Sequence, residues 1–319
     1  MCRPASFVVV KNGTGLKALW HPSVSDSHED IIEHFKLRER NVRNEITFVR
    51  VEIVPPDDDY NLPPSKWKYN LDQDVLPKWY DAGKVEAAVR AELKVWIKAK
   101  VVKSGKTKKE VKGGERVAVV YGVVDNVHNG GVVDNVHNNG VVGHVHDGGV
   151  VNHVHGGGVV KSVYNGGVVG HVYNGGSVKS VHNGGVVKCV HGGGVVKSVY
   201  NGGSVENVYG GGVVEDVYGV VKNVGDGGVV DNVYGGGVVK SVYNGGVVGH
   251  VYNGGSVNHV GDGGVVKSVS NGGAVEKIKD RGTVIYYTKP NLAALKEANA
   301  VIIDHSGKKV KCYVGPQKN

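Results

Sequence analysis

The chain has 319 residues, of which 51 are glycine and 7% are aromatic, and its net charge is +8. So much glycine with so few aromatic residues excludes an ordinary globular core along the whole chain, and the regular order of the glycines excludes a random linker. The positive charge lies at the two ends, because residues 121–280 hold 9 Lys and Arg against 11 Asp and Glu.

Targeting signals and membrane spans are not evident in the sequence. The first residues, MCRPASFVVV, lack the long apolar stretch of a secretory signal, and no run of about 18 apolar residues occurs. The cysteines, Cys2, Cys189 and Cys312, are odd in number and far apart, which favours a reducing compartment over a disulfide framework. We therefore expect no membrane partner and no secretion by a signal peptide.

Residues 1–100 predict a small α+β head domain. Phe7–Val10 and Thr47–Val54 have the composition of strands, and the prolines that follow end the second one. The segment SDSHEDIIEHFKL predicts a helix that Ser27 caps, with Asp30 as its capping-box partner.

A second, longer helix is expected from Asp81, as its cap, to about Lys100. Its apolar residues recur at helical spacing and would share one face that packs on the strands. They are Val85, Val89, Leu93 and Trp96.

Three segments of the head, DSHEDII, FVRVEIVPPDDD and WKYNLDQDVLPKWYD, carry a resemblance. Over about residues 7–97 they resemble a domain of uncharacterised proteins from phages and prophage-bearing bacteria, in some of which it precedes Val-rich nine-residue repeats. The resemblance implies a phage origin and a head-then-repeat layout, and it implies no activity.

Catalysis in the head would have to use its polar side chains. Paired carboxylates such as Asp72 and Asp74 could hold a metal or act in acid–base chemistry. However, the sequence has no P-loop, no G-x-S-x-G, no HExxH and no Cys/His metal spacing, so we expect no enzyme and no cofactor. The polar candidates are His28, Glu29, Asp57, Asp58, Asp59, Asp72, Asp74 and Tyr80.

Residues 101–122 predict a basic linker that leads into the repeats. Lys106, Lys108 and Lys109 could contact nucleic-acid phosphates or an acidic protein, although a lysine run is more often a solvated face. No aromatic residues are interleaved over 98–116, so stacking on bases has no support there.

Residues 123–282 form 18 units of nine residues, such as VVKSVYNGG, of which one, VVEDVYG at Val213, is two residues short. A short fixed period predicts a solenoid. Position two is always Val and position five is Val except at Ile278, so we expect both to face the core. Polar positions three and four predict a bend, and the Asn-Gly-Gly at positions seven to nine predicts a tight turn with positive φ.

Each coil of the solenoid is expected to contain two units. Nine such coils at ~4.8 Å would form a rod of roughly 43 Å. A coil of three units, 27 residues, is the alternative that the spacing of Ser177 and Ser204 suggests. The two-unit coil is preferred because a thin valine core fills a narrow coil better.

The repeat resembles the calcium-binding β-roll repeat of secreted toxins, G-G-x-G-x-D-x-U-x. Here Val replaces the third glycine, and the Asp position is filled by Asp only once, at Asp216. The carboxylate ladder that Ca²⁺ needs is absent. We therefore expect a solenoid that folds without metal.

Position six of most units is Tyr or His, and coil stacking would align these rings into a ladder. Mutual stacking that stiffens the rod is one interpretation. The other is a binding face for a protein strand, a sugar or bases. The tyrosines named for that face are Tyr164, Tyr173, Tyr200, Tyr209, Tyr243 and Tyr252.

Two His-x-His pairs raise the question of a metal. In a strand, both histidines of His144-Val-His146 or of His153-Val-His155 point to one face, so adjacent coils could offer four imidazoles to Zn²⁺ or Fe²⁺. No Cys or carboxylate completes the set, and solvent-facing histidines are the more common outcome, so we expect no metal there.

Residues 283–319 predict a C-terminal cap made of a last coil, a short helix at NLAALKEANA and a closing hairpin. A cap prevents end-to-end pairing of the exposed strand edge, and Lys308, Lys309 and Lys311 suit that role.

The sequence thus predicts a small α+β head domain followed by an all-β, single-chain β-solenoid with two nonapeptide units per coil and a cap. We expect a non-enzymatic phage-type interaction or scaffold protein, cytoplasmic in the host cell or part of a virion, that binds a protein partner and could form oligomers. The alternatives are a nucleic-acid-associated protein that uses its basic ends and an enzyme with its site in the head.

Overall fold

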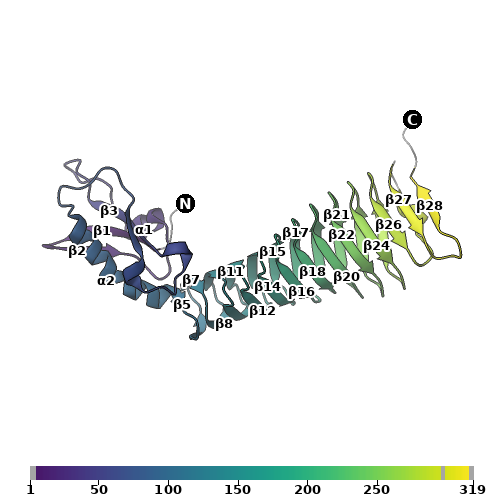
Figure 1. Ribbon diagram of the computed structural model, residues 1–319, viewed down its shortest axis with the longest axis horizontal. Coiled ribbons are helices and arrows are strands. Elements are labelled where there is room, and N and C mark those ends of the chain that lie inside the picture. The colour runs from purple at the N-terminus through teal and green to yellow at the C-terminus, as the bar shows by residue number, and fades with distance from the viewer. Residues whose placement is uncertain (1–4, 296–298, 316–319) are drawn as a thin grey trace.

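The computed structural model describes residues 5–295 and 299–315. It has a head at the N-terminal end and a straight rod of stacked strands that extends from it (Figure 1). The predicted fold class is confirmed: a small α+β region precedes a parallel β-solenoid of about 11 turns. No helix in the described ranges has both the length and the apolar character needed to cross a membrane.

The head is built on a four-stranded sheet of order β2-β1-β3-β4. Its strands are antiparallel: β1 (Ser6–Asn12), β2 (Gly15–Leu19), β3 (Phe48–Val54) and β4 (Lys68–Leu71). Two of them, β2 and β4, were not predicted. One face of the sheet packs on the long helix α2 (Ala82–Lys100), and the other packs on the short helix α1 (His28–His34) through Ile31.

Both predicted helices form, but only one predicted cap does. Asp81 accepts a hydrogen bond from the Lys84 backbone N–H at 3.0 Å, which caps α2. Ser27 stands at the N-cap of α1 without a side-chain cap bond, so the expected capping box is wrong. Asp30 accepts a hydrogen bond from Ser25 instead. Two 3₁₀ turns, Pro56–Asp58 and Pro64–Lys66, follow β3.

The register of the solenoid confirms two units per coil. Each strand pairs in parallel with the strand 18 residues away, as Val142 does with Val160 and Val145 with Val163. The third position of each unit is missing from this pairing, which is the expected bend. Because the chain bends there, positions two and five can both face inward although they are three residues apart.

Consecutive units alternate between two sheets, one of 13 strands and one of 11. The repeat strands of the 13-stranded sheet are β8 (Val123–Val127), β10 (Val141–Val145), β12 (Val159–Val163), β14 (Ser177–Val181), β16 (Val195–Val199), β18 (Val213–Val217), β20 (Val229–Val233), β22 (Val247–Val251) and β24 (Val265–Val269). Those of the 11-stranded sheet are β9 (Val132–Val136), β11 (Val150–Val154), β13 (Val168–Val172), β15 (Val186–Val190), β17 (Ser204–Val208), β19 (Val220–Val224), β21 (Val238–Val242), β23 (Ser256–Val260) and β25 (Ala274–Ile278).

The sheets continue beyond the repeats at both ends. At the N-terminal end, β5 (Val101–Val102), β6 (Thr107–Val111) and β7 (Arg116–Val120) make the first coils. At the other end, β26 (Thr283–Tyr286), β27 (Val301–Asp304) and β28 (Lys311–Val314) extend the larger sheet, and β27 and β28 form the predicted hairpin. The predicted terminal helix is a 3₁₀ turn at Leu292–Ala294, and the rest of that segment lies partly outside the described residues.

The turn residues have two different duties. Asn165 and Gly166, at positions seven and eight of their unit, have positive φ values of 46° and 77°. Gly167, at position nine, does not. A Cβ there would lie 2.1 Å from the carbonyl oxygen of Val145 in the coil below, so position nine requires glycine for close approach.

The head and the rod share one hydrophobic core. Trp96 of α2, Tyr60 and Trp67 pack with Val119 and Tyr121, which belong to the first coils of the rod. The Tyr121 hydroxyl donates to the Asp58 carbonyl and accepts from the Tyr60 backbone N–H, both at 3.0 Å. This buried contact fixes the head on the end of the solenoid.

We predict that Gly167→Ala lowers the free energy of unfolding by at least about 2 kcal/mol, because the added methyl group meets the Val145 carbonyl. Gly166→Asn is the matched control, because Asn139 occupies the same unit position with φ 65°. Urea unfolding of the two variants checks this. Equal stabilities would contradict the steric role of position nine.

Candidate functional site

A cleft of about 850 Å³ lies where the head meets the rod. We call it the junction cleft. Its walls are polar and come from both parts of the protein, so neither part forms it alone. The head contributes Ser25, Asp26, Ser27, His28, Glu29, Arg50 and Asp72, and the rod contributes Arg116, Ala118, Asp134, Asn135, Asn152 and His153.

Asp26 is an acidic group held deep in this cleft. It accepts a hydrogen bond from the indole N–H of Trp96 at 3.0 Å. Burial raises the pKa of Asp26 to about 6, although the nearby Lys100 opposes the shift. The Lys100 ammonium donates to the Val24 carbonyl at 2.7 Å, and burial lowers its pKa. Shifted groups of this kind concentrate at functional sites.

The rod side of the cleft holds a rigid charged pair and one unsatisfied nitrogen. Arg116 donates two hydrogen bonds of 2.7 Å to the Asp134 carboxylate, which also accepts from Asn152 at 2.8 Å. The Nδ1 atom of His153 is buried and has no hydrogen-bond partner within the described ranges. Burial lowers the pKa of His153, so this imidazole is neutral at pH 7 and can bond to a ligand.

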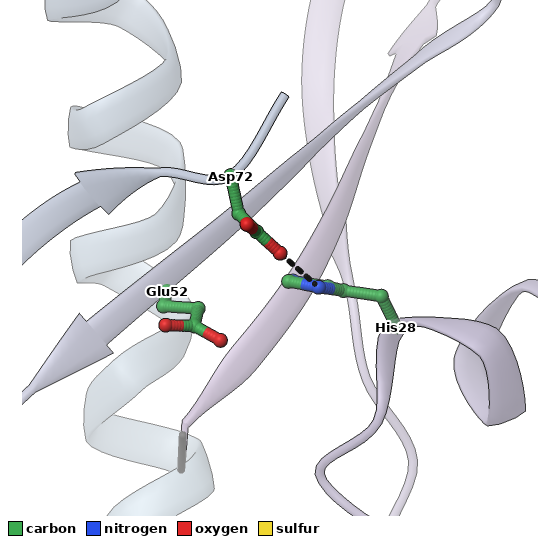
Figure 2. A group of neighbouring side chains, drawn as sticks. All are labelled: His28, Glu52 and Asp72. Carbon is green, nitrogen blue, oxygen red and sulfur yellow. Dashed lines mark ion pairs between the residues drawn. The ribbon is translucent and has the colours of Figure 1, made fainter. Parts of the chain in front are cut away.

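On the head side, three side chains from different elements converge (Figure 2). His28 begins α1, Glu52 lies on β3 and Asp72 directly follows β4. The Nδ1 atom of His28 is 3.1 Å from an Asp72 carboxylate oxygen, and its Nε2 atom is 3.0 Å from the Val51 carbonyl oxygen. The potential ligand atoms of the three residues all lie within 4.8 Å of one another.

Of the polar head residues chosen from the sequence, the structure brings His28 and Asp72 together but leaves Asp74 out of the group. Glu52 was missed. Its only signal in the sequence is a charged residue between Val51 and Ile53 of a buried strand, which shows that it faces the other side of the sheet from them.

The Tyr and His rings form two ladders, one for each sheet, instead of a single one. The first ladder follows the 13-stranded sheet and the second follows the 11-stranded sheet, with most neighbouring ring centroids about 5 Å apart and nearly parallel. The first runs through His128, His146, Tyr164, His182, Tyr200, Tyr218, Tyr234 and Tyr252. The second runs through Tyr121, His137, His155, Tyr173, His191 and Tyr209.

The six tyrosines chosen from the sequence are thus divided between two edges of the rod. Tyr164 and Tyr173 have a ring stacked on each side, so both of their faces are covered. Tyr209 stacks on His191, and Tyr252 meets Tyr234 edge-on. A Cβ on Gly225 would lie 2.7 Å from the Tyr243 ring, so that ring covers the glycine. Tyr200 differs, since it is 45% exposed.

The two His-x-His pairs are not brought together. Because consecutive units alternate between sheets, His144 and His146 follow one sheet and His153 and His155 follow the other. His146 instead stacks on His128, and His155 stacks on His137.

The lysines of residues 101–122 lie on the first coil of the rod. Lys108 forms an ion pair of 3.5 Å with Glu115. Lys109 shares strand β6 with Lys108, and Lys106 lies in the turn before that strand. Nucleic-acid binding through these three lysines stays a prediction.

The first ladder is interrupted at the unit that is two residues short. There the turn consists of Tyr218 and Gly219 alone, and both backbone N–H groups donate to the Val199 carbonyl. The ring of Tyr200 turns edge-on to His182, with centroids 6.2 Å apart. A cavity of about 520 Å³ opens beside this short turn, lined by Ser180, His182, Asn183, Tyr200, Asn201, Tyr218 and Gly235. We call this cavity the notch.

A second short turn, Tyr121-Gly122, has the same construction. Its two backbone N–H groups both donate to the Val102 carbonyl, as those of Tyr218 and Gly219 do to Val199. The difference lies in what covers it. The head loop 58–61 lies over the Tyr121 turn, where the Tyr121 hydroxyl bonds to the loop backbone and Lys103 donates to the Asn61 carbonyl.

Comparison of the chain with models of known protein families, with curated proteins and with solved structures found no match. The phage origin implied by the resemblance therefore stays a prediction.

The second ladder predicts acid sensitivity. Burial lowers the pKa of His155 to about 4, against an ordinary value of 6.5. Between these values the unfolded chain binds the proton more readily than the folded one, so stability falls as the pH falls from about 6.5 toward 4. We predict that His155→Tyr, which keeps a ring at this position, loses less stability than the natural chain.

Melting temperatures of the two proteins at pH 7 and pH 5 provide the measurement. Both should be stable at pH 7, where His155 is neutral in the folded and unfolded states. An equal decrease at pH 5 would show that His155 does not contribute to the acid sensitivity.

Proposed function

We propose that this is a non-enzymatic interaction protein whose solenoid binds a loop of a partner protein at the notch. The observation that carries the proposal is the pair of equivalent short turns. One of them, at Tyr121, is covered by a polypeptide loop of the head, whereas no described residue covers the other in the same way. The first turn thus provides a template for what the second could bind.

The chemistry of the notch suits a polypeptide backbone. In regular coils the turns bond to one another, as when Asn183 donates to the Asn201 carbonyl and Gly184 to the Gly202 carbonyl. The short unit lacks the two residues that would accept the next such bonds from Asn201 and Gly202. The carbonyl groups of an incoming loop can accept them instead, as in recognition by strand addition.

The aromatic groups at the notch supply apolar contact area. Tyr200 and Tyr218 stack with centroids 5.8 Å apart, and Tyr200 is the more exposed of the two. Partly exposed tyrosines are enriched at protein interfaces because the ring buries apolar surface and the hydroxyl keeps a polar contact. Elsewhere in the ladders the rings stack on one another, which supports a stiffening role there and leaves little ring face for sugars or bases.

A rigid arm with a head at one end fits either of two settings, a virion component or an intracellular factor that blocks a host protein. Both settings rest on the phage resemblance. Nucleic-acid association through the basic ends and catalysis in the head are the alternative proposals, and the junction cleft is the observation that favours the latter.

The test places a photo-crosslinking amino acid at Tyr200 of the full chain, in the cells in which the protein is naturally made. We predict a crosslink to a partner polypeptide from position 200. Tyr164 is the matched control, because it belongs to the same ladder but is covered on both faces. Equal crosslinking from both positions would contradict binding at the notch.

A second variant separates the notch from the rest of the rod. Insertion of Asn-Gly between Tyr218 and Gly219 restores the regular unit VVEDVYNGG, so it should fold and fill the notch. We predict that the insertion abolishes the crosslink from position 200. A crosslink that persists, or one that joins only two copies of this chain, would overturn the proposal.

A further inference from the structure

The group formed by His28, Glu52 and Asp72 has a composition that metal ions select. One imidazole nitrogen and two carboxylate groups form a mixed set that suits Mn²⁺, Fe²⁺ and Zn²⁺. The set also combines elements that are far apart in the sequence, since His28 begins α1, Glu52 lies on β3 and Asp72 follows β4.

The orientation of His28 is the second, independent observation. A carbonyl oxygen can only accept, so the contact of 3.0 Å with Val51 requires the proton of the imidazole on Nε2. In the neutral ring the lone pair is then on Nδ1, the atom that faces Asp72 at 3.1 Å. Histidines that bind metals are usually held in this way, by donation from the second ring nitrogen to a carbonyl or carboxylate.

The distances also fit. Two ligand atoms at about 2.1 Å from an ion and at right angles to each other are about 3.0 Å apart. The separation of 3.1 Å between His28 Nδ1 and Asp72 is close to that value, and the ligand atoms of Glu52 lie within 4.8 Å of both. A lone pair that faces two carboxylates is repelled by their charge, so a cation among the three groups, either a proton or a metal ion, stabilises the arrangement.

We propose that His28, Glu52 and Asp72 bind one divalent transition-metal ion on the head wall of the junction cleft. Three protein ligands leave coordination positions open, which is the arrangement of sites that also bind a water or a further ligand. His28 and Asp72 both line the cleft, so these positions are accessible from it. The Asp72 side chain is 54% exposed, which gives the ion a route of entry.

The test uses the full chain stripped of metals by a chelator and titrated with Mn²⁺, whose free ion has a strong electron paramagnetic resonance signal. Mn²⁺ has little affinity for sites made of histidine alone, so the ladders should not compete for it. We expect one Mn²⁺ per chain. Asp72→Asn and Glu52→Gln should each lower the affinity at least about tenfold.

Asp74→Asn and Glu29→Gln are the matched controls, because both carboxylates are exposed nearby and outside the group of three. They should bind Mn²⁺ like the natural chain. Thermal unfolding of every variant in the presence of chelator checks that the fold is kept. No loss of the free Mn²⁺ signal at millimolar concentrations, or equal losses of affinity in Asp72→Asn and Asp74→Asn, would overturn the proposal.

Discussion

Parallel pairing at a spacing of 18 residues is the constraint on which the rest of this structure depends. It places each valine of position two or five directly on the same position of the next coil, so Val124, Val142 and Val160 form one fully buried column. No single unit buries its own valines, so stability arises between neighbouring coils. The same register brings backbone close to backbone, which explains why a carbonyl such as Val145 O requires glycine at position 167.

The register also determines what a shortened unit does. Loss of two turn residues leaves both strands paired, since Val214 and Val230 still align across the missing residues. The change is therefore confined to the edge of the rod, where the turn ladder breaks and the notch opens. At the other short turn the head loop makes the contacts with Tyr121. A rod built from identical coils thus acquires distinct surface sites only where a unit departs from the period.

Much of the fold could be predicted because the repeat is its own alignment. The invariant Val at positions two and five revealed the core, and the variable polar residues between them revealed the bend. The candidate sites could not be predicted in the same way, because each joins residues that the period does not relate. Glu52 lies in an unrepeated strand, and the pairing of Asp134 with Arg116 depends on where the head stops and the first coil begins. A repeat predicts its own contacts and none with a unique domain.

The junction is where these two kinds of structure meet, and its polar groups depend on its apolar ones. Tyr60, Trp96 and Tyr121 bury the contact between head and rod, and Trp96 also donates to Asp26 at the base of the cleft. Movement of the head relative to the rod would disrupt this aromatic cluster and would separate Asp26 and Lys100 from Asp134 and Arg116. The core that joins the two parts therefore also fixes the spacing of charges across the cleft, and whatever binds there would meet a preformed site.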